Sequence, residues 1–317
     1  MQRRPPSQVI YYIIKRLLSI IPVGCGVIIS VSLLIHMVPG NPVDILLGDY
    51  ASSEERAELT QQLGLDQPVL SQIAHYTGGL LEGDLGTSLI YNKSVFSLIL
   101  ERIVPTVELA VSAMILAILL SIPLGIWSAL RKNTWADFSA LLFSLLGIAI
   151  PHFWLGPMLI IIFSIKLDLL PVSERSGLSS YILPAVTLGT ALMALLSRIT
   201  RTSILEILKE DYIKTARAKG LSEWRIVLKH VLRNAYLPVL TILGLQFSTL
   251  LTGAIVTESI FDWPGLGSLV LEALNQRDYP LVQGCILFFA LSYLLINLAT
   301  DILYLFLDPR IKLPGEV

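Results

Sequence analysis

Residues 105–130 read PTVELAVSAMILAILLSIPLGIWSAL, and from Leu109 to Leu130 this stretch contains no ionisable side chain. An α-helix needs about 20 apolar residues to cross the roughly 30 Å hydrocarbon core of a bilayer. Buried helices of soluble proteins rarely stay uncharged over such a length. The stretch is therefore predicted to be a membrane-spanning helix.

Five further runs share this length and apolar character. Together the runs predict six spans, at residues 9–37, 105–130, 138–165, 180–200, 237–257 and 281–307. Composition agrees, because only 15% of the residues are charged, against about 25% in soluble domains. The run at 9–37 is too long for a signal peptide and lacks a small-residue cleavage pattern, so it is interpreted as a retained span. The expected fold class is an all-α integral membrane protein with six transmembrane helices.

Lys and Arg predict which way the spans face, because they are enriched on the cytoplasmic side of short loops. They gather at the N-terminus, after 130, between Arg198 and Arg233, and at the C-terminus, where they include Arg3, Arg4, Lys15, Arg16, Arg131, Lys132, Arg310 and Lys312. Both termini are therefore expected in the cytoplasm. The predicted layout is a cytoplasmic N-terminus with the first span (1–38), an extracytoplasmic segment (39–104), a five-helix core (105–307) and a cytoplasmic tail (308–317).

The outward segment 39–104 is too long for a simple connection. Ser52 and Glu55 have the spacing of a capping box, which predicts a short helix. A second amphipathic stretch follows Pro68, and Gly83-Asp84-Leu85-Gly86-Thr87-Ser88 is rich in turn residues. We expect two or three short helices at the outer mouth, acting either as a cover for a gate or as a surface addition.

The longest inward loop, 201–236, contains a sharp corner between two helical stretches. Ile204, Ile207, Leu208 and Tyr212 have helical spacing. Gly220 lies where a left-handed helix C-cap is expected, with Leu221 available for the accompanying apolar contact. Ser222 can begin the next helix as its N-cap. The corner could present Lys214, Thr215, Arg217, Ala218 and Lys219 to a cytoplasmic partner, although a basic amphipathic segment can equally lie on the membrane surface.

Several motifs in this order resemble one transporter family. They are Leu63-Gly64-Leu65-Asp66-Gln67-Pro68, the turn-rich run at 83–88, the run from Tyr212 to Gly220 with Leu237-Pro238 beyond it, Glu258-Ser259-Ile260-Phe261-Asp262-Trp263-Pro264-Gly265-Leu266-Gly267, Arg277-Asp278-Tyr279-Pro280 and Asp308-Pro309-Arg310-Ile311. Across nearly the whole chain, the sequence resembles permease subunits of binding-protein-dependent ATP-binding cassette (ABC) importers. It is most similar to the peptide/nickel branch, whose members import dipeptides, oligopeptides, glutathione or nickel complexes.

The resemblance implies a set of partners and a coupling element. The partners are a second homologous permease, two ATP-binding subunits and an extracytoplasmic solute-binding protein, within the lipid of a bacterial inner membrane. Residues implied to couple to an ATP-binding subunit are Lys214, Thr215, Ala216, Arg217, Ala218, Lys219, Gly220, Leu221 and Ser222. The broad family pattern has a Glu-Ala-Ala triplet where this chain has Lys214-Thr215-Ala216.

No residue pattern indicates that the chain is an enzyme or binds a cofactor. ATP hydrolysis needs a phosphate-binding Gly-Lys loop, and no Gly-Lys pair occurs in the sequence. There is also no His-Glu-x-x-His or paired-Cys metal motif and no Gly-x-Ser-x-Gly elbow. ATP and magnesium are therefore expected on the partner subunits, and nucleic acid is not an expected partner.

A translocation path needs polar atoms, and the spans offer a few. Possible lining residues are His152, Thr187, Thr190, Gln246, Ser248, Thr249 and Thr252. Small hydroxyl residues also serve membrane helix packing, so both roles stay open. Contact with the binding protein or an outer gate is assigned to Asp84, Trp263, Pro264 and Gly265. Trp263 is equally consistent with anchoring at the membrane interface.

The sequence thus predicts a permease subunit of an ATP-driven importer for peptides or a related small solute. The first alternative is an ion-coupled secondary carrier. Such carriers hold ionisable residues near mid-membrane. Here Glu108, Glu258 and Asp301 are predicted near span ends, and only His152 near a middle. The second alternative is a membrane-embedded scaffold without transport, which accumulation of a solute would exclude.

Overall fold

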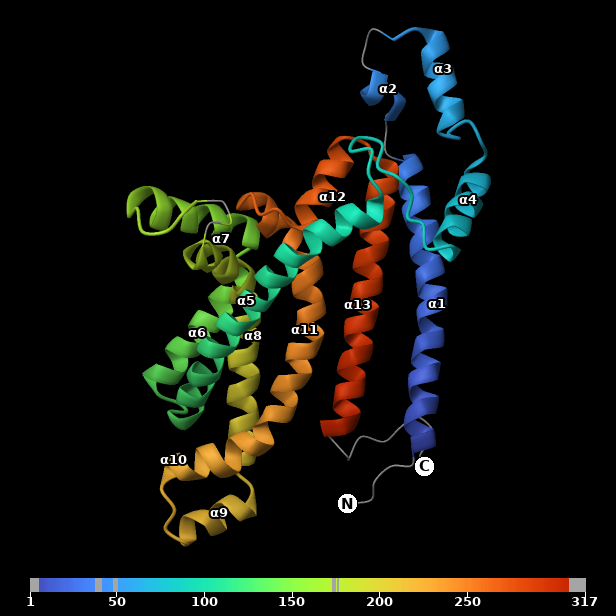
Figure 1. Ribbon diagram of the computed structural model, residues 1–317. Helices are drawn as coiled ribbons and strands as arrows, with labels where there is room; N and C mark the ends of the chain where they lie inside the picture. The colour runs from blue at the N-terminus through green and yellow to red at the C-terminus, as the bar shows by residue number, and fades with distance from the viewer. Residues whose placement is uncertain (1–5, 38–41, 48–50, 173–174, 176, 308–317) are drawn as a thin grey trace. The chain divides into compact units, whose positions relative to one another are not determined.

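The computed structural model describes residues 6–37, 42–47, 51–172, 175 and 177–307 (Figure 1). The predicted tail 308–317 and the basic residues Arg3 and Arg4 lie outside these ranges. Within them the chain is helical, and its only β pairing is an isolated bridge between Thr87 and Ser94. The all-α prediction is confirmed.

Five continuous helices in the described residues are long and apolar enough to cross a membrane. They are α1 (Pro6–Met37), α5 (Val95–Leu130), α8 (Ile182–Ile207), α11 (Leu232–Ile260) and α13 (Tyr279–Leu307). Each contains or overlaps a predicted span, but the boundaries differ. α5 begins at Val95 rather than at 105, and α8 continues to Ile207 rather than ending near 200.

The predicted span at 138–165 is not one straight helix, and the six-span prediction holds when the bent helix pair that occupies it is counted as one broken span. Two helices occupy it, α6 (Trp135–Ala149) and α7 (His152–Leu159), the latter continuing into the π-helix η1 (Ile160–Lys166). They meet at an angle of 105°. Pro151 explains the break, because it has no N–H for an α-helical bond and disfavours helical backbone in the preceding residue. Ile150 accordingly has an extended conformation, with ψ 118°.

The chain divides into two compact units. Of the described residues, unit 1 comprises those within 107–263 and 299–307, so it holds most of α5, all of α6 to α11 and the end of α13. Unit 2 comprises those within 6–106 and 264–298, so it holds α1 to α4, the start of α5, α12 (Leu266–Asn275) and most of α13.

Small residues let the helices of unit 1 approach closely. A Cβ added to Gly189 of α8 would lie 2.8 Å from the main-chain oxygen of Ala113 in α5. A Cβ on Gly125 of α5 would lie 2.7 Å from the main-chain oxygen of Ser197 in α8. The hydroxyls of Ser144 and Ser197 are 2.7 Å apart and join α6 to α8. This packing through small and hydroxyl residues is typical of membrane helix bundles.

A buried ion pair ties the start of α6 to α8. Arg201 donates to both carboxylate oxygens of Asp137, at 2.7 and 2.8 Å. Asp137 also accepts from the hydroxyl of Ser128 at 2.6 Å and the amide of Asn133 at 2.9 Å. Because this carboxylate is 3% exposed, its charge is compensated almost entirely by these neighbours.

Unit 2 contains the predicted short helices α2 (Pro42–Leu47), α3 (Ser53–Gln62) and α4 (Val69–Leu81). The capping box at α3 is confirmed. The hydroxyl of Ser52 accepts from the amide of Glu55, and the Glu55 carboxylate accepts from the amide of Ser52. The Glu55 carboxylate accepts from both the amide and the hydroxyl of Ser52, and these two bonds lower the pKa of Glu55, since they favour the ionised carboxylate.

A buried carboxylate joins the turn-rich loop to the start of α13. Asp278 accepts from the hydroxyl of Ser88 at 2.5 Å and from the amides of Leu89 and Ile90 at 3.2 and 3.3 Å. It also accepts from the amide of Leu281 in the first turn of α13, so it acts as the helix cap. One fully buried side chain therefore holds two segments far apart in the sequence.

Candidate functional site: the corner between α9 and α10

The predicted glycine corner has the hydrogen bonds of a Schellman motif. It ends α9 (Asp211–Ala218), and Gly220 has φ +76°. The amide of Gly220 donates to the Arg217 oxygen at 2.9 Å, and the amide of Leu221 donates to the Ala216 oxygen at 3.3 Å. A left-handed residue at this position favours glycine, because a Cβ would crowd the following carbonyl.

The chain then turns into α10 (Glu223–Ile226), which continues through the π-helix η3 (Val227–Val231) into α11. Ser222 occupies the predicted N-cap position, but its side chain makes no capping hydrogen bond. The Glu223 side chain instead pairs with Arg217 across the corner, with bonds of 2.7 and 3.1 Å. This pair raises the pKa of Arg217, so its charge is fixed.

The corner is attached to unit 1 through a buried apolar cluster. The cluster comprises Ala129, Ile204, Ile213, Ala216, Ile226, Val231 and Ala235. It joins α9 and α10 to α8, α11 and the end of α5, and Leu221 packs against it. Because the contact is made by close-packed side chains, a displacement of α9 would be transmitted directly to the ends of α8 and α11.

The predicted coupling residues divide between this cluster and the surface. Those exposed are Lys214, Thr215, Arg217, Ala218, Lys219, Gly220 and Ser222. Ala216 is buried and Leu221 is half-buried, so they support the corner from within. The predicted helical spacing of Ile204, Ile207, Leu208 and Tyr212 does not belong to one helix. α8 ends at Ile207, and a separate helix, α9, begins at Asp211. Ile213 is buried there, and Tyr212 is 42% exposed.

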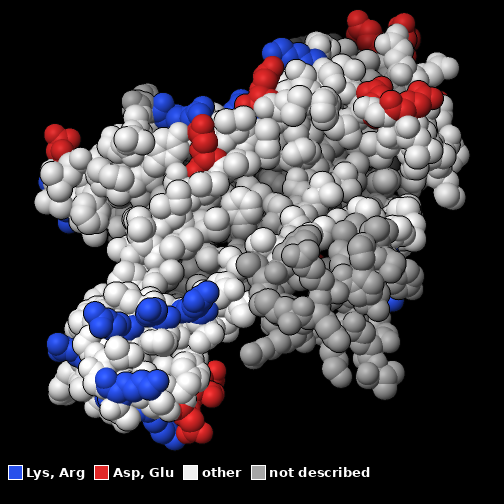
Figure 2. Space-filling view, turned by 60° about the horizontal axis from the view of Figure 1, so that its bottom comes forward, with Lys and Arg blue, Asp and Glu red and all other residues white. Residues whose placement is uncertain are grey.

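Figure 1 shows α9 and α10 at one end of unit 1, beyond α8 and α11. Lys and Arg side chains gather at this end, with acidic side chains at its edge (Figure 2). Lys214 is partly neutralised by Asp211, at 2.8 Å. The surface therefore combines a glycine corner with exposed cations, which a protein partner of opposite charge could recognise.

The predicted path residues of α7 and α8 lie at helix contacts. Nδ1 of His152 donates to the main-chain oxygen of Thr187, at 2.6 Å. Thr187 is fully buried, and its hydroxyl donates to the Leu183 oxygen in its own helix. Thr190 donates to the Val186 oxygen and lies beside Gly147 of α6. These contacts support the packing interpretation for all three side chains.

The predicted path residues of α11 differ in exposure. Ser248 is fully buried, Gln246 and Thr252 are half-buried, and Thr249 is exposed. Thr249 and Thr252 donate to main-chain oxygens one turn earlier, a bond that satisfies the hydroxyl within the helix. Gln246, Thr249 and Thr252 therefore remain accessible candidates for contact with a solute.

The predicted outer-contact residues also differ in exposure. Asp84 is exposed, and its carboxylate accepts from the amide of Gly86 at 2.8 Å. Trp263 is 1% exposed and packs edge-on against Tyr181, with ring centroids 4.8 Å apart. In unit 2, Pro264 is half-buried, and Gly265 is the N-cap of α12. Asp84 is therefore the most accessible of the four.

Sequence reasoning missed the ionic contacts of unit 1. No local sequence signal identifies Asp137 and Arg201 as an ion pair, because the two residues are 64 positions apart. Glu108, considered as a coupling acid, pairs with Arg175 at 2.5 Å and accepts from the hydroxyl of Tyr181 at 2.8 Å. Among the described residues, no group of three His, Cys, Asp or Glu side chains is arranged to hold a metal ion.

Comparison with known proteins identifies the family. Residues 121–313 match the binding-protein-dependent transport system inner membrane component, and residues 9–110 match the N-terminal model of such membrane components. The chain is 44% identical over 301 residues to the glutathione transport system permease protein GsiC of Salmonella typhimurium (strain LT2) and of Escherichia coli (strain K12). Each match covers 95% of this chain and 98% of the relative.

Solved structures support the fold. The inward-facing MetNI methionine ABC transporter matches 67% of this chain and 97% of its own chain, with a TM-score of 0.54 and 15% identity. An amino acid ABC transporter solved with histidines matches with a TM-score of 0.51, covering 68% of this chain and 95% of its own. The chain therefore belongs to the family of binding-protein-dependent transport system inner membrane components, as a permease subunit of an ATP-driven importer of the peptide/nickel branch.

Proposed function

We propose that this chain carries glutathione or a similar short peptide inward, together with a second permease subunit. Two ATP-binding subunits dock on the cytoplasmic face of the permease pair, and a solute-binding protein delivers the solute from outside. The identity of 44% to glutathione permeases over nearly the full length supports the solute class. The enrichment of Lys and Arg in the segments assigned to the cytoplasm supports the proposed orientation, with both termini inside.

The single observation that carries the coupling role is the anchored corner at Gly220. Its exposed residues, Lys214 to Gly220 apart from Ala216, form a compact surface on a buried apolar cluster. An ATP-binding subunit that closes on this surface would move α9. The cluster would pass that movement to α8 and α11, the two helices that hold most of the candidate path residues.

ATP and magnesium are assigned to the partner subunits, and this chain binds neither in the proposed mechanism. It has no phosphate-binding Gly-Lys loop. Its own contribution is mechanical, because the buried pair of Asp137 and Arg201 makes the start of α6 follow α8 when α8 moves.

Reconstitution tests this function. The tagged chain is purified gently with its partners, placed in liposomes and supplied with the solute-binding protein and labelled glutathione. We expect uptake that requires ATP on the side of the liposome membrane where the ATP-binding subunits lie. Uptake should stop when the solute-binding protein is omitted. Uptake driven by a proton or sodium gradient without ATP, or by the chain alone, would contradict the proposal and favour a secondary carrier.

A further inference from the structure

The helical segment that follows the Gly220 corner carries two rows of exposed side chains. It consists of α10, η3 and the start of α11, which follow one another without a gap. The apolar row is Trp224 and Leu228, which are 64% and 60% exposed, with the half-buried Leu232 beyond them. The basic row consists of three exposed cations, Arg225, Lys229 and Arg233.

The π-helix keeps each row on one side of the segment. Members of both rows are four residues apart in the sequence. In a regular α-helix such a repeat drifts by about 40° per step around the axis, since one turn takes about 3.6 residues. The wider turn of η3, whose hydrogen bonds reach one residue further, offsets this drift. Another side of the same segment packs on unit 1, where Ile226, Val231 and Ala235 are buried.

The two rows lie where the chain enters its membrane span. The helical chain from Glu223 to Ile260 is much longer than the roughly 20 residues that cross a hydrocarbon core. The predicted span begins at 237, so both rows precede it. Figure 1 shows α10 turned away from the axis of α11. Trp, Lys and Arg side chains are typical of the boundary between membrane and water.

The basic row has no acidic partner within the part of the chain that the structure describes. Arg225, Lys229 and Arg233 form no ion pair there, whereas Lys214 and Arg217 of α9 each pair with an acidic side chain. Figure 2 shows the Lys and Arg side chains that gather over this end of unit 1. Like charges four residues apart destabilise a helix slightly, so an external anion along the row would be favourable.

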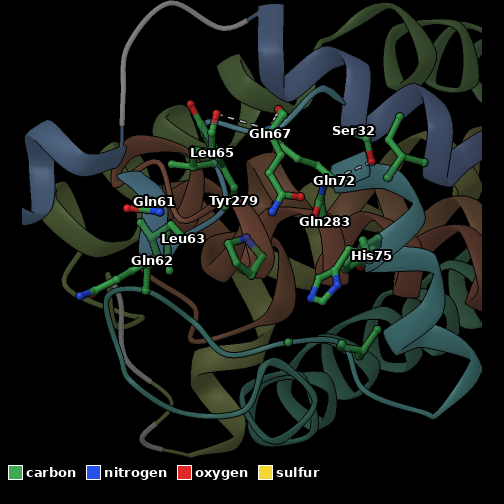
Figure 3. Close-up of a pocket in the computed structure, with 17 residues that line it drawn as sticks. Ser32, Gln61, Gln62, Leu63, Leu65, Gln67, Gln72, His75, Tyr279 and Gln283 are labelled. Carbon is green, nitrogen blue, oxygen red and sulfur yellow. Dashed lines mark hydrogen bonds between the residues drawn. The ribbon is translucent and has the colours of Figure 1, made fainter. Parts of the chain in front are cut away.

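Unit 2 contains a pocket of about 410 Å³, between α4 and the first turns of α13, that differs from this surface (Figure 3). Among the described residues that line it there is no Lys or Arg. Nε2 of Gln72 already donates to the main-chain oxygen of Gln67 at 2.9 Å, and Nε2 of Gln283 to the hydroxyl of Ser32 at 3.2 Å. An anionic group would therefore find a better match on the basic row than in this pocket.

We propose that α10 and η3 lie along the lipid headgroups and bind anionic phospholipid. Arg225, Lys229 and Arg233 pair with headgroup phosphates, and Trp224 and Leu228 enter the boundary between headgroups and acyl chains. A lipid surface offers anions and apolar chains side by side, which matches both rows. The two helices of the corner thus have different partners, a protein for α9 and lipid for α10. The proposal holds whether or not ATP drives transport, because it concerns only the contact between this chain and lipid.

Photocrosslinking to lipid tests this contact. A benzophenone amino acid replaces Leu228, and the full chain, with the subunits that co-purify, is placed in nanodiscs of equal parts dioleoyl phosphatidylglycerol and dioleoyl phosphatidylcholine. We expect lipid adducts with at least about threefold more phosphatidylglycerol than phosphatidylcholine, counted by mass spectrometry. The same probe at Leu119, which is 64% exposed within α5, should label both lipids equally, because it meets acyl chains.

Charge variants identify the row as the cause of this preference. Arg225→Gln with Lys229→Gln should bring the ratio of the two lipids close to that of the nanodisc. Lys166→Gln with Lys209→Gln removes the same charge from other exposed positions of unit 1 and should leave the ratio unchanged. Arg225→Lys with Arg233→Lys should also keep it, since the attraction depends on charge. The melting temperature, which exposed substitutions should hardly change, excludes misfolding.

Three results would overturn the proposal. The first is no lipid adduct at position 228, or equal labelling of the two lipids there. The second is a preference for phosphatidylglycerol that survives in Arg225→Gln with Lys229→Gln. The third is an adduct with a protein subunit in place of lipid, which would assign this face to the assembly.

Discussion

The guanidinium of Arg217 reaches across the Gly220 corner and donates two hydrogen bonds to the carboxylate of Glu223. The side chains are 43% and 56% exposed, and exposed pairs stabilise a fold by only about 0–1 kcal/mol. The pair therefore adds little to stability, and what it provides is a direct link across the corner between the end of α9 and the start of α10.

That geometry can be tested by reversing the charges. Arg217→Glu and Glu223→Arg each place like charges opposite one another, and each should lower ATP-dependent uptake severalfold while changing the melting temperature little. The double variant restores an opposite pair and should recover uptake if the contact acts within the chain. Failure of the double variant to recover would show that Arg217 acts through a partner instead.

Gly220 should tolerate only residues that accept left-handed backbone. Gly220→Val places a β-branched residue at φ +76°, which costs roughly 1–2 kcal/mol and opens the corner. We expect the variant to insert in the membrane and to lose uptake, measured in membrane vesicles with the amount of chain determined by immunoblot. Gly220→Asn is the matched control and should keep most activity, because asparagine tolerates this conformation. Equal uptake by the Val and Asn variants would contradict the prediction.

The corner could be predicted from sequence because its signals are local. Gly220, Leu221 and Ser222 follow one another, and helix caps depend on such neighbours. Long apolar runs identified the spans for the same reason. The break at Pro151 was not predicted, because a proline inside an apolar run is compatible with either a kink or a complete break. Tertiary packing decides whether the helix kinks or breaks at this proline. In this structure, Gly156 of α7, beyond the break, packs closely against Ile260.

Removing one partner of the buried pair of Asp137 and Arg201 should destabilise unit 1. Asp137→Ala leaves a largely buried guanidinium without its counter-ion, which costs about 3–5 kcal/mol when burial is complete. Because the Arg201 side chain is 19% exposed, we expect the lower part of that range. The melting temperature in detergent measures the loss. Asp211→Ala is the control, because its pair with Lys214 is largely exposed and its removal should have little effect.

Close helix packing at Gly189 predicts a second loss of stability. A methyl group there would lie 2.8 Å from the Ala113 oxygen, so Gly189→Ala must push α5 and α8 apart, at about 1–3 kcal/mol. Gly24→Ala has the same chemistry in α1, where a Cβ meets nothing within 4 Å. A lower melting temperature for the first variant only is the expected result. Equal melting temperatures would show that the helices adjust without strain.

Contact between the corner and an ATP-binding subunit is the central claim, and photocrosslinking in native membranes tests it most directly. A benzophenone amino acid replaces Ala218, which is exposed on the corner, or Trp135, which is 84% exposed at the start of α6. We predict an adduct with an ATP-binding subunit from position 218 and none from position 135. An active complex that gives no such adduct from position 218, or from Thr215 or Lys219 substituted in the same way, would contradict the assignment of this surface to coupling.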